Sequence, residues 1–303
     1  MKRIITFLFL FCLLLQNSLA QTTIDYGSNE EAGRYAKVND IKVYYEVYGE
    51  GDPLLLIHGN GGSIENFSYQ LPAFSKHFKV IAVDSRAQGR TTDSDQEITY
   101  AIMASDMAVL IEKLKLNSVF VVGWSDGGNV GLELAFAYPE KVKKLVTIGA
   151  NFVADSTAVP FLFSGIPQNE TLSDLDSNQM KLKEWCRKNV TENPSKLSPH
   201  PERLPIIQKK LSDLMINYPD FTVEQLARID CPTLVIAGDH DLIRDEHSLK
   251  LFHALQNAQL CIIPGSSHLV PAEKPVLVNN IIITFLETPY RDIDRYYFLR
   301  GLW

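Results

Sequence analysis

The chain has 303 residues, of which 46% are hydrophobic and 21% are charged. This length and composition allow a large hydrophobic core in one α/β domain or two small ones, and they exclude a low-complexity or disordered protein. The formal net charge of −7 excludes nucleic acid as an expected partner, because an acidic chain and the phosphate backbone repel each other.

The first 20 residues have the pattern of an export signal. A basic Lys2-Arg3 start is followed by an apolar run over residues 4–15 and by a small-residue cleavage site, Ser18-Leu19-Ala20. A membrane anchor is the alternative, but the run is shorter than the roughly 20 apolar residues that span a bilayer. We therefore expect a mature chain that begins at Gln21, has no membrane span and is periplasmic or secreted.

Strand patterns begin after a polar lead. Residues 34–38 and 41–48 read as two strands joined by Asn39-Asp40, which predicts an antiparallel hairpin at the edge of a sheet. Short apolar runs then recur at residues 54–57, 80–83, 119–122, 145–148, 233–237 and 260–263. Helical patterns separate most of these runs, at residues 66–77, 100–116, 129–138, 245–256 and 276–286. This alternation predicts an α/β fold with a mostly parallel central sheet flanked by helices on both faces.

One interval, residues 151–229, interrupts the alternation. It is rich in proline and has helical patterns near residues 175–189 and 206–215, without a clear buried strand. We interpret it as a helical cap inserted over the carboxyl edge of the sheet; a structural excursion with no access to the site is the alternative. The predicted domains are a signal peptide at 1–20, a core formed by 21–150 and 230–303, and the cap at 151–229.

The most informative motif is Gly123-Trp124-Ser125-Asp126-Gly127, which lies between an apolar run and a helical pattern. A Gly-x-Ser-x-Gly sequence in this setting is a nucleophile elbow, because its small residues let the chain turn sharply and expose the serine hydroxyl at the sheet edge. Ser125 is therefore the candidate nucleophile.

A serine nucleophile needs a base, and the base needs an orienting acid. His268 lies in a Gly/Ser loop directly after the last predicted strand, where a side chain can reach over the sheet edge. Asp239 and Asp241 both follow the preceding strand, so both are candidates for the acid. Asp241 is preferred because it lies further into the loop and because the chain order Ser, Asp, His is the one this fold uses.

Acyl transfer also needs donors for the developing oxyanion. The predicted donors are the backbone N–H of Asp126 and that of Asn60 or Gly61, in the glycine-rich loop after the run at 54–57. His58, which ends that run, is interpreted as a structural residue that braces the turn.

The carboxylate of Asp126 has no required role in acyl transfer and has two interpretations. It could cap the helix that begins near Gly127, where the positive end of the helix and its free N–H groups favour an acid. Alternatively it faces the acyl pocket and pairs with an ammonium group of the substrate. On the second interpretation Asp126 and Trp124, the two neighbours of the serine, are the candidate substrate-binding residues.

Taken together, these motifs make nearly the whole mature chain resemble the α/β-hydrolase-fold enzymes. The resemblance is carried by five stretches: His58-Gly59-Asn60-Gly61-Gly62, residues 84–91, Gly123-Trp124-Ser125-Asp126-Gly127-Gly128, Gly238-x-x-Asp241 and Gly265-x-x-His268. Within that superfamily the elbow is similar to that of the valacyclovir-hydrolase-like esterases. The chain departs from the family's Asp-x-Arg-Gly-x-Gly loop, because Ala87 and Gln88 stand after Arg86.

The resemblance implies a serine hydrolase of the carboxylesterase type. Ser125 would attack the carbonyl of a small acyl substrate, His268 would take and return the proton, Asp241 would hold the imidazole, and water would release the acyl group. No metal or organic cofactor is needed. A lactonase, for example one acting on acyl-homoserine lactones, is the alternative enzyme, and thioesters and carbon–carbon bonds stay open. A low-turnover ligand-binding protein is the alternative from another class. The sequence leaves the oligomeric state open.

Overall fold

The computed structural model describes residues 24–165, 177–192, 196–291, 293, 296, 299 and 300, so the predicted signal peptide lies outside the described residues. Within them, eight strands form one sheet in the order β1-β2-β4-β3-β5-β6-β7-β8. Their bounds are β1 Gly33–Val38, β2 Ile41–Tyr48, β3 Pro53–Ile57, β4 Lys79–Val83, β5 Val119–Trp124, β6 Val142–Ile148, β7 Thr233–His240 and β8 Ala258–Ser267. The expected mostly parallel sheet is confirmed.

The antiparallel part of the sheet is confined to its first edge. β1 pairs with β2 and β2 with β4 in antiparallel register, whereas the pairs from β4 to β8 are all parallel. The hairpin turns at Asn39, which adopts a φ of 48°, a conformation that asparagine tolerates better than most residues. The predicted hairpin is thus confirmed.

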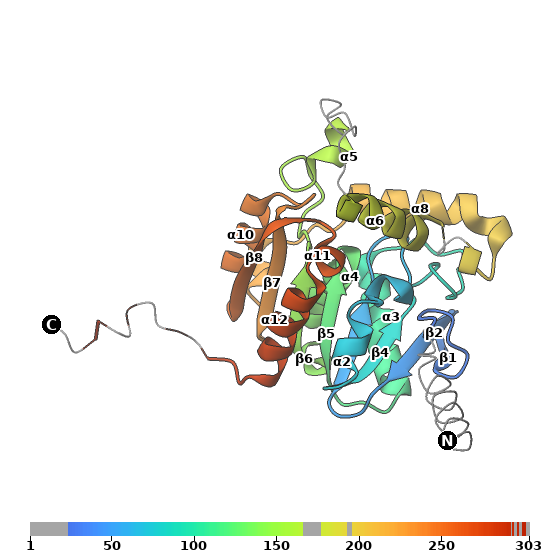
Figure 1. Ribbon diagram of the computed structural model, residues 1–303, viewed down its shortest axis with the longest axis horizontal. Coiled ribbons are helices and arrows are strands. Elements are labelled where there is room, and N and C mark those ends of the chain that lie inside the picture. Colours follow the sequence, from blue (N-terminus) through green and yellow to red (C-terminus); the bar gives the residue numbers. More distant parts are fainter. Residues whose placement is uncertain are drawn as a thin grey trace, which may run out of the picture.

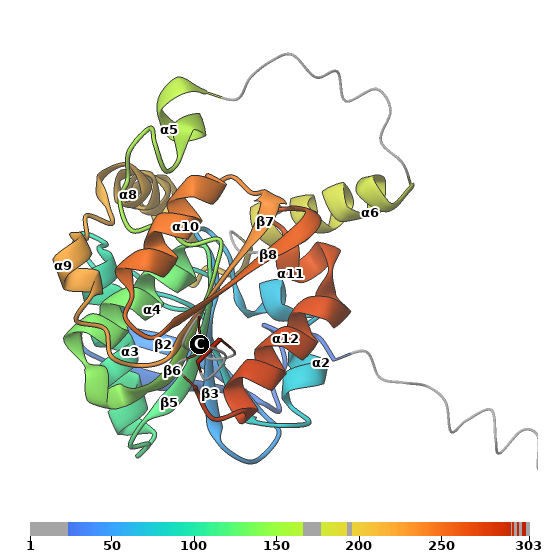
Figure 2. The same cartoon turned by 90° about the vertical axis from the view of Figure 1, so that its left-hand side faces the viewer.

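Helices cover both faces of the sheet, as Figure 2 shows, with α3, α4 and α10 on one side and α2 and α12 on the other. These helices are α2 Leu71–Phe74, α3 Tyr100–Lys113, α4 Asp126–Ala137, α10 Asp245–Ala254 and α12 Pro275–Glu287, with α11 at Val270–Glu273 before the last. Because neither face meets solvent, every residue of β5 is buried. This is why the central strands read as continuous apolar runs.

The single helix expected over residues 66–77 is wrong. The chain forms a 3₁₀ turn at Ile64–Phe67 and then the short helix α2. Pro72 lies in the first turn of α2, where its missing N–H costs nothing, but it could not continue a helix from residue 66 because its ring clashes with the preceding turn.

Helical elements fill the interval between β6 and β7, and among its described residues the one β pairing is an isolated bridge between Val153 and Asp220. The elements are α5 Pro160–Ser164, α6 Ser177–Cys186, a π-helical segment Arg187–Glu192, a 3₁₀ turn Pro201–Arg203, α8 Leu204–Asn217 and α9 Val223–Leu226. In Figure 1, α5, α6 and α8 lie across the upper end of the sheet.

Ion pairs and amide contacts hold this interval against the core. Arg203 and Lys210 both reach Asp93, in the loop after β4, at 2.8 and 3.1 Å, and the Asp93 side chain is almost fully buried. On the other side, Asn66 Nδ2 donates to the carbonyl of Asn189 at 2.9 Å. No helix in the described part of the chain is both long and apolar enough to cross a membrane.

Candidate active site

The backbone at Ser125 makes the sharp turn that the motif predicts. Ser125 has φ 56° and ψ −123°, between the end of β5 and the start of α4, and its N–H donates to Ile148 O at 2.7 Å. A Cβ at Gly123 would overlap the carbonyl oxygen of Gly127, and one at Gly127 would overlap that of Ile57. Both glycines are therefore required by close backbone approach, and the strained serine is held at the carboxyl edge of the sheet.

His268 and Asp241 form the pair that a serine nucleophile needs. His268 Nδ1 lies 2.6 Å from Asp241 Oδ1, and the aspartate side chain is fully buried. Burial opposes ionisation of Asp241, but the charge and hydrogen bond of His268 and the N–H groups of Ile243 and Gly238 outweigh it, so the pKa of Asp241 is lowered. The carboxylate is thus in the charged form that can orient an imidazole.

Asp239 lies apart from this pair. Its carboxylate contacts His240 Nδ1 at 2.8 Å and accepts the N–H groups of Gly265 and Ser266. Of the two candidate acids, Asp241 is therefore the one beside His268.

Ser125 and His268 line the same cavity, which has a volume of about 390 Å³. No hydrogen bond joins the two side chains within the described structure; such contacts often tighten only when substrate binds. Trp124 also lines the cavity, and its indole Nε1 donates to the carbonyl oxygen of His268 at 2.9 Å. Trp124 thereby fixes the backbone of the candidate base.

The two candidate donors in the loop after β3 differ in their partners. The N–H of Gly61 donates to Gln88 Oε1 at 2.6 Å, whereas the N–H of Asn60 meets no acceptor among the described residues. The N–H of Asp126 lies at the start of α4, where helix geometry supplies no partner. The free donors beside Ser125 are therefore those of Asn60 and Asp126.

The departure from the family's loop pattern has a structural counterpart. Ala87 has a φ of 62°, which is strained by about 1–2 kcal/mol for a residue with a Cβ and would be easy for the usual glycine. Gln88 supplies the oxygen that binds the N–H of Gly61. Gln88 thus fixes the loop that carries Asn60.

His58 braces this region, as the sequence predicts. It is fully buried, with Nδ1 2.7 Å from the carbonyl of Gly59, and Nε2 accepts the N–H of Ser85 at 3.0 Å. Burial lowers the pKa of His58 to about 4, against the opposing hydrogen bond to Gly59. The imidazole is therefore neutral, with its proton on Nδ1.

The carboxylate of Asp126 does not cap α4. It accepts a hydrogen bond from Asn60 Nδ2 at 2.7 Å, and the residue is 7% exposed. Burial raises the pKa of Asp126, although the hydrogen bonds from Asn60 and Tyr100 and the charge of His268 oppose that change. The side-chain contact with Asn60 links the two residues whose N–H groups are free.

Known proteins match this chain over the region that holds the elbow. Residues 52–185 match the family model of the alpha/beta hydrolase fold. The chain has the α/β-hydrolase fold. A protein of Haemophilus influenzae provisionally named an esterase/lipase is 29% identical over 257 residues, which cover 77% of this chain and 82% of that protein. Human serine hydrolase BPHL is 27% identical over 256 residues, covering 80% and 82%.

Solved structures agree with the fold of this α/β hydrolase. A thermophilic esterase from Thermogutta terrifontis superposes with a TM-score of 0.68 at 23% identity, covering 84% of this chain and 97% of that one. The enol-lactonase from Burkholderia xenovorans gives a TM-score of 0.64 at 21% identity, covering 84% and 100%. The resemblance inferred from the motifs is confirmed, and the chain is a hydrolase.

Several cavity residues of the α/β hydrolase escaped the sequence analysis. Leu242 and Leu269 each directly follow a residue of the His268–Asp241 pair, so their positions were a usable signal. Cys186, at the end of α6, lines the same cavity, and Tyr100 reaches Asp126 from α3. The last two lie far from the motifs in sequence, and no local pattern marks them.

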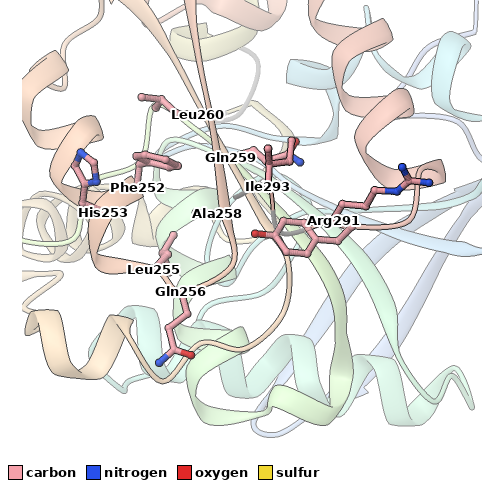
Figure 3. A pocket seen from close by; sticks show the side chains of 10 residues that line it. Phe252, His253, Leu255, Gln256, Ala258, Gln259, Leu260, Arg291 and Ile293 are labelled. Carbon is pink, nitrogen blue, oxygen red and sulfur yellow. The ribbon is translucent and has the colours of Figure 1, made fainter. Parts of the chain in front are cut away.

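A second cavity, of about 670 Å³, lies away from the candidate site, at the beginning of β8. Figure 3 shows Phe252 from α10, Leu255 directly after that helix, and Ala258 and Leu260 from β8 on its walls, with Arg291 from the segment after α12. The described part of its lining holds no serine, cysteine or aspartate. Among the described residues, no group of three or more His, Cys, Asp or Glu side chains is arranged to hold a metal ion.

Proposed function

We propose that this α/β hydrolase is an exported carboxylic ester hydrolase that works through Ser125, His268 and Asp241. The observation that carries the proposal is the 2.6 Å contact between His268 and the buried Asp241 at the cavity that the strained Ser125 also lines. A nucleophile, a base and an orienting acid in one cavity are the components that acyl transfer requires.

The proposed reaction has two halves. Ser125 Oγ attacks the ester carbonyl while His268 Nε2 takes its proton, and Asp241 holds Nδ1–H and stabilises the imidazolium that forms. The N–H groups of Asn60 and Asp126 receive the oxyanion. His268 then protonates the departing alcohol, and a water molecule activated by the same imidazole releases the acid.

Residues 151–229 serve in this proposal as a cap that contributes walls to the substrate cavity. Cys186 of α6 lines the cavity, and the carbonyl of Leu211 in α8 accepts from Asn60 Nδ2 at 3.3 Å. Trp124 and Asp126 act as substrate-binding residues on either side of the nucleophile.

The decisive test is active-site labelling of the purified protein with a fluorophosphonate, followed by turnover of matched ester, lactone and amide panels. We expect labelling and ester hydrolysis in the parent, and loss of both in Ser125→Ala with the fold retained. Removing a triad serine leaves only the small residual rate supplied by binding and the oxyanion donors. Ser75→Ala, away from the site at the end of α2, is the matched control. Parental turnover in Ser125→Ala would refute the assignment.

Export is tested separately from catalysis. Fractionation of cells that express the full chain should recover soluble protein outside the cytoplasm, with a first residue of Gln21 by mass spectrometry. An intact Met1 terminus in washed membranes would instead support the anchor interpretation of residues 1–20.

A further inference from the structure

Two compartments of very different size meet at Ser125 and His268. The larger one has a volume of about 390 Å³, and Trp124, Cys186 and Leu269 contribute to its walls. The smaller one has a volume of about 40 Å³. Since a cavity needs roughly 10–15 Å³ to hold one water, the smaller compartment has room for about one to three non-hydrogen atoms.

The smaller compartment lies toward α3, α5 and α8. Its walls include the polar residues Tyr100, Asp126 and Asn151 and, on the other side, the apolar Phe161 and Met215. The Asp126 carboxylate accepts a hydrogen bond from Asn60 Nδ2 at 2.7 Å, which holds this wall. Rotation of Asp126 to admit a longer chain would break that hydrogen bond.

Of the residues that the structure describes, Leu242 is the one besides Ser125 and His268 that lines both compartments. Its two chain neighbours are joined by a hydrogen bond, because Ile243 N–H donates to Asp241 Oδ1 at 3.0 Å. Leu242 itself is 46% exposed. An apolar residue thus lies between the two spaces, directly after the orienting acid.

We propose that Leu242 divides the site and that the substrate is an ester with one short arm, of about one to three non-hydrogen atoms, and one longer apolar arm. This inference rests on the proposed ester hydrolase function. The short arm occupies the compartment beside Asp126 and Tyr100, and the long arm occupies the one beside Trp124 and Leu269. Transfer of each methylene of the long arm from water to that cavity should raise kcat/KM by up to about fourfold.

Two ester series test the division. One lengthens the acyl chain of methyl esters from two to ten carbons; the other lengthens the alcohol of acetate esters over the same range, with turnover followed by acid release. We expect kcat/KM to fall at least tenfold beyond three non-hydrogen atoms in one series and to rise with length in the other. A parallel response of the two series would overturn the proposal.

Variants of Leu242 test whether this residue separates the two compartments. Leu242→Ala should raise kcat/KM for four- to six-carbon short arms at least tenfold relative to the two-carbon ester, and Leu242→Phe should move the limit the other way. Leu269→Ala, in the larger compartment alone, should reduce the gain per methylene of the long arm and leave the short-arm limit in place. Leu249→Ala, a similarly exposed leucine on α10, should match the parent. An unchanged limit in both Leu242 variants would overturn the role of Leu242.

Fluorophosphonate labelling distinguishes failure of the proposed serine hydrolase function from failure of the proposed division of the site. A parent that takes no label contradicts the proposed serine hydrolase function. A parent and a Leu242→Ala variant that label at equal rates, yet show no length limit in either ester series, contradict only the division of the site.

Discussion

Burial and hydrogen bonding give the two carboxyl groups near Ser125 opposite properties. Asp241 is buried beside His268, and that partner holds its pKa low. Asp126 is buried among neutral donors, and the loss of water raises its pKa. The pKa values of two aspartates within one site are thus shifted in opposite directions, Asp241 toward its charged form and Asp126 toward its neutral form.

Substitution of Asp241 should reduce catalysis far more than substitution of Asp239. Asp241→Asn should lower kcat/KM about 10³- to 10⁴-fold, because an amide at this position favours the wrong imidazole tautomer. Asp239→Asn should cost less than tenfold, since its partners are His240 and two backbone N–H groups of the neighbouring loop. Ester turnover of the two variants is the measurement. Equal defects would move the orienting role to Asp239.

A second prediction concerns the charge of Asp126. If its carboxylate receives a substrate ammonium, an aminoacyl ester should be preferred over its deaminated analogue by about tenfold to a hundredfold in kcat/KM. The preference should grow as pH rises through the raised pKa of Asp126, because only the carboxylate attracts the cation, and it should fade as the amine loses its proton near pH 8.

Asp126→Asn isolates that charge. The amide still offers an oxygen to Asn60 Nδ2, so the two oxyanion donors should stay in place and turnover of the deaminated ester should change little. The aminoacyl preference and its pH dependence should both disappear. A preference that survives in the variant would restrict Asp126 to positioning Asn60.

The sequence predicts some of the secondary-structure elements and contacts better than others. The strands were predictable because burial on both faces leaves continuous apolar runs, and the elbow was predictable because its Gly-x-Ser-x-Gly pattern lies between an apolar run and a helical pattern. The helix expected at 66–77 does not form because Pro72 cannot lie in the interior of a helix. The contacts that seat α6 and α8 could not be predicted, since Asn66–Asn189 and Asp93–Arg203 join residues more than 100 positions apart.

The attachment of α8 gives the third prediction. Asp93→Asn leaves Arg203 and Lys210 without the buried anion that they share, and Arg203 keeps only the exposed Asp95, so the attachment of α8 should weaken. Limited proteolysis should therefore cut within α8 sooner than in the parent. Asp213→Asn, which removes the exposed i,i+4 pair with Lys209 on the same helix, should change the rate little. Equal protection in Asp93→Asn and the parent would contradict this attachment.

For the whole molecule, buried groups with shifted pKa values determine how the stability of the fold depends on pH. Burial lowers the pKa of His247 and of His58 to about 4, so both must stay neutral in the folded chain as the solution is acidified. Burial raises the pKa of Asp84 to about 7, so this group favours the folded state at low pH and opposes it as pH rises. The parental profile is the sum of these opposed contributions, and single variants are needed to separate them.

A variant of His247 can isolate the contribution of one of these groups. His247 lies on α10, where Phe152 stacks on its ring and donates its backbone N–H to Nε2 at 3.0 Å. Between pH 6.5 and 4 the unfolded chain binds a proton at His247 that the folded chain does not, so stability falls on acidification through this window and is level above it. Across this pH window, His247 should lower the free energy of unfolding by about 2–4 kcal/mol.

His247→Gln should therefore be most destabilising near pH 7. Its deficit in the free energy of unfolding, relative to the parent, should shrink by that amount at pH 4. Denaturant unfolding at a series of pH values measures the deficit, with His253→Gln, exposed on the same helix, as the control that should follow the parental profile. A deficit that is constant with pH would mean that His247 acts by packing on Phe152 alone.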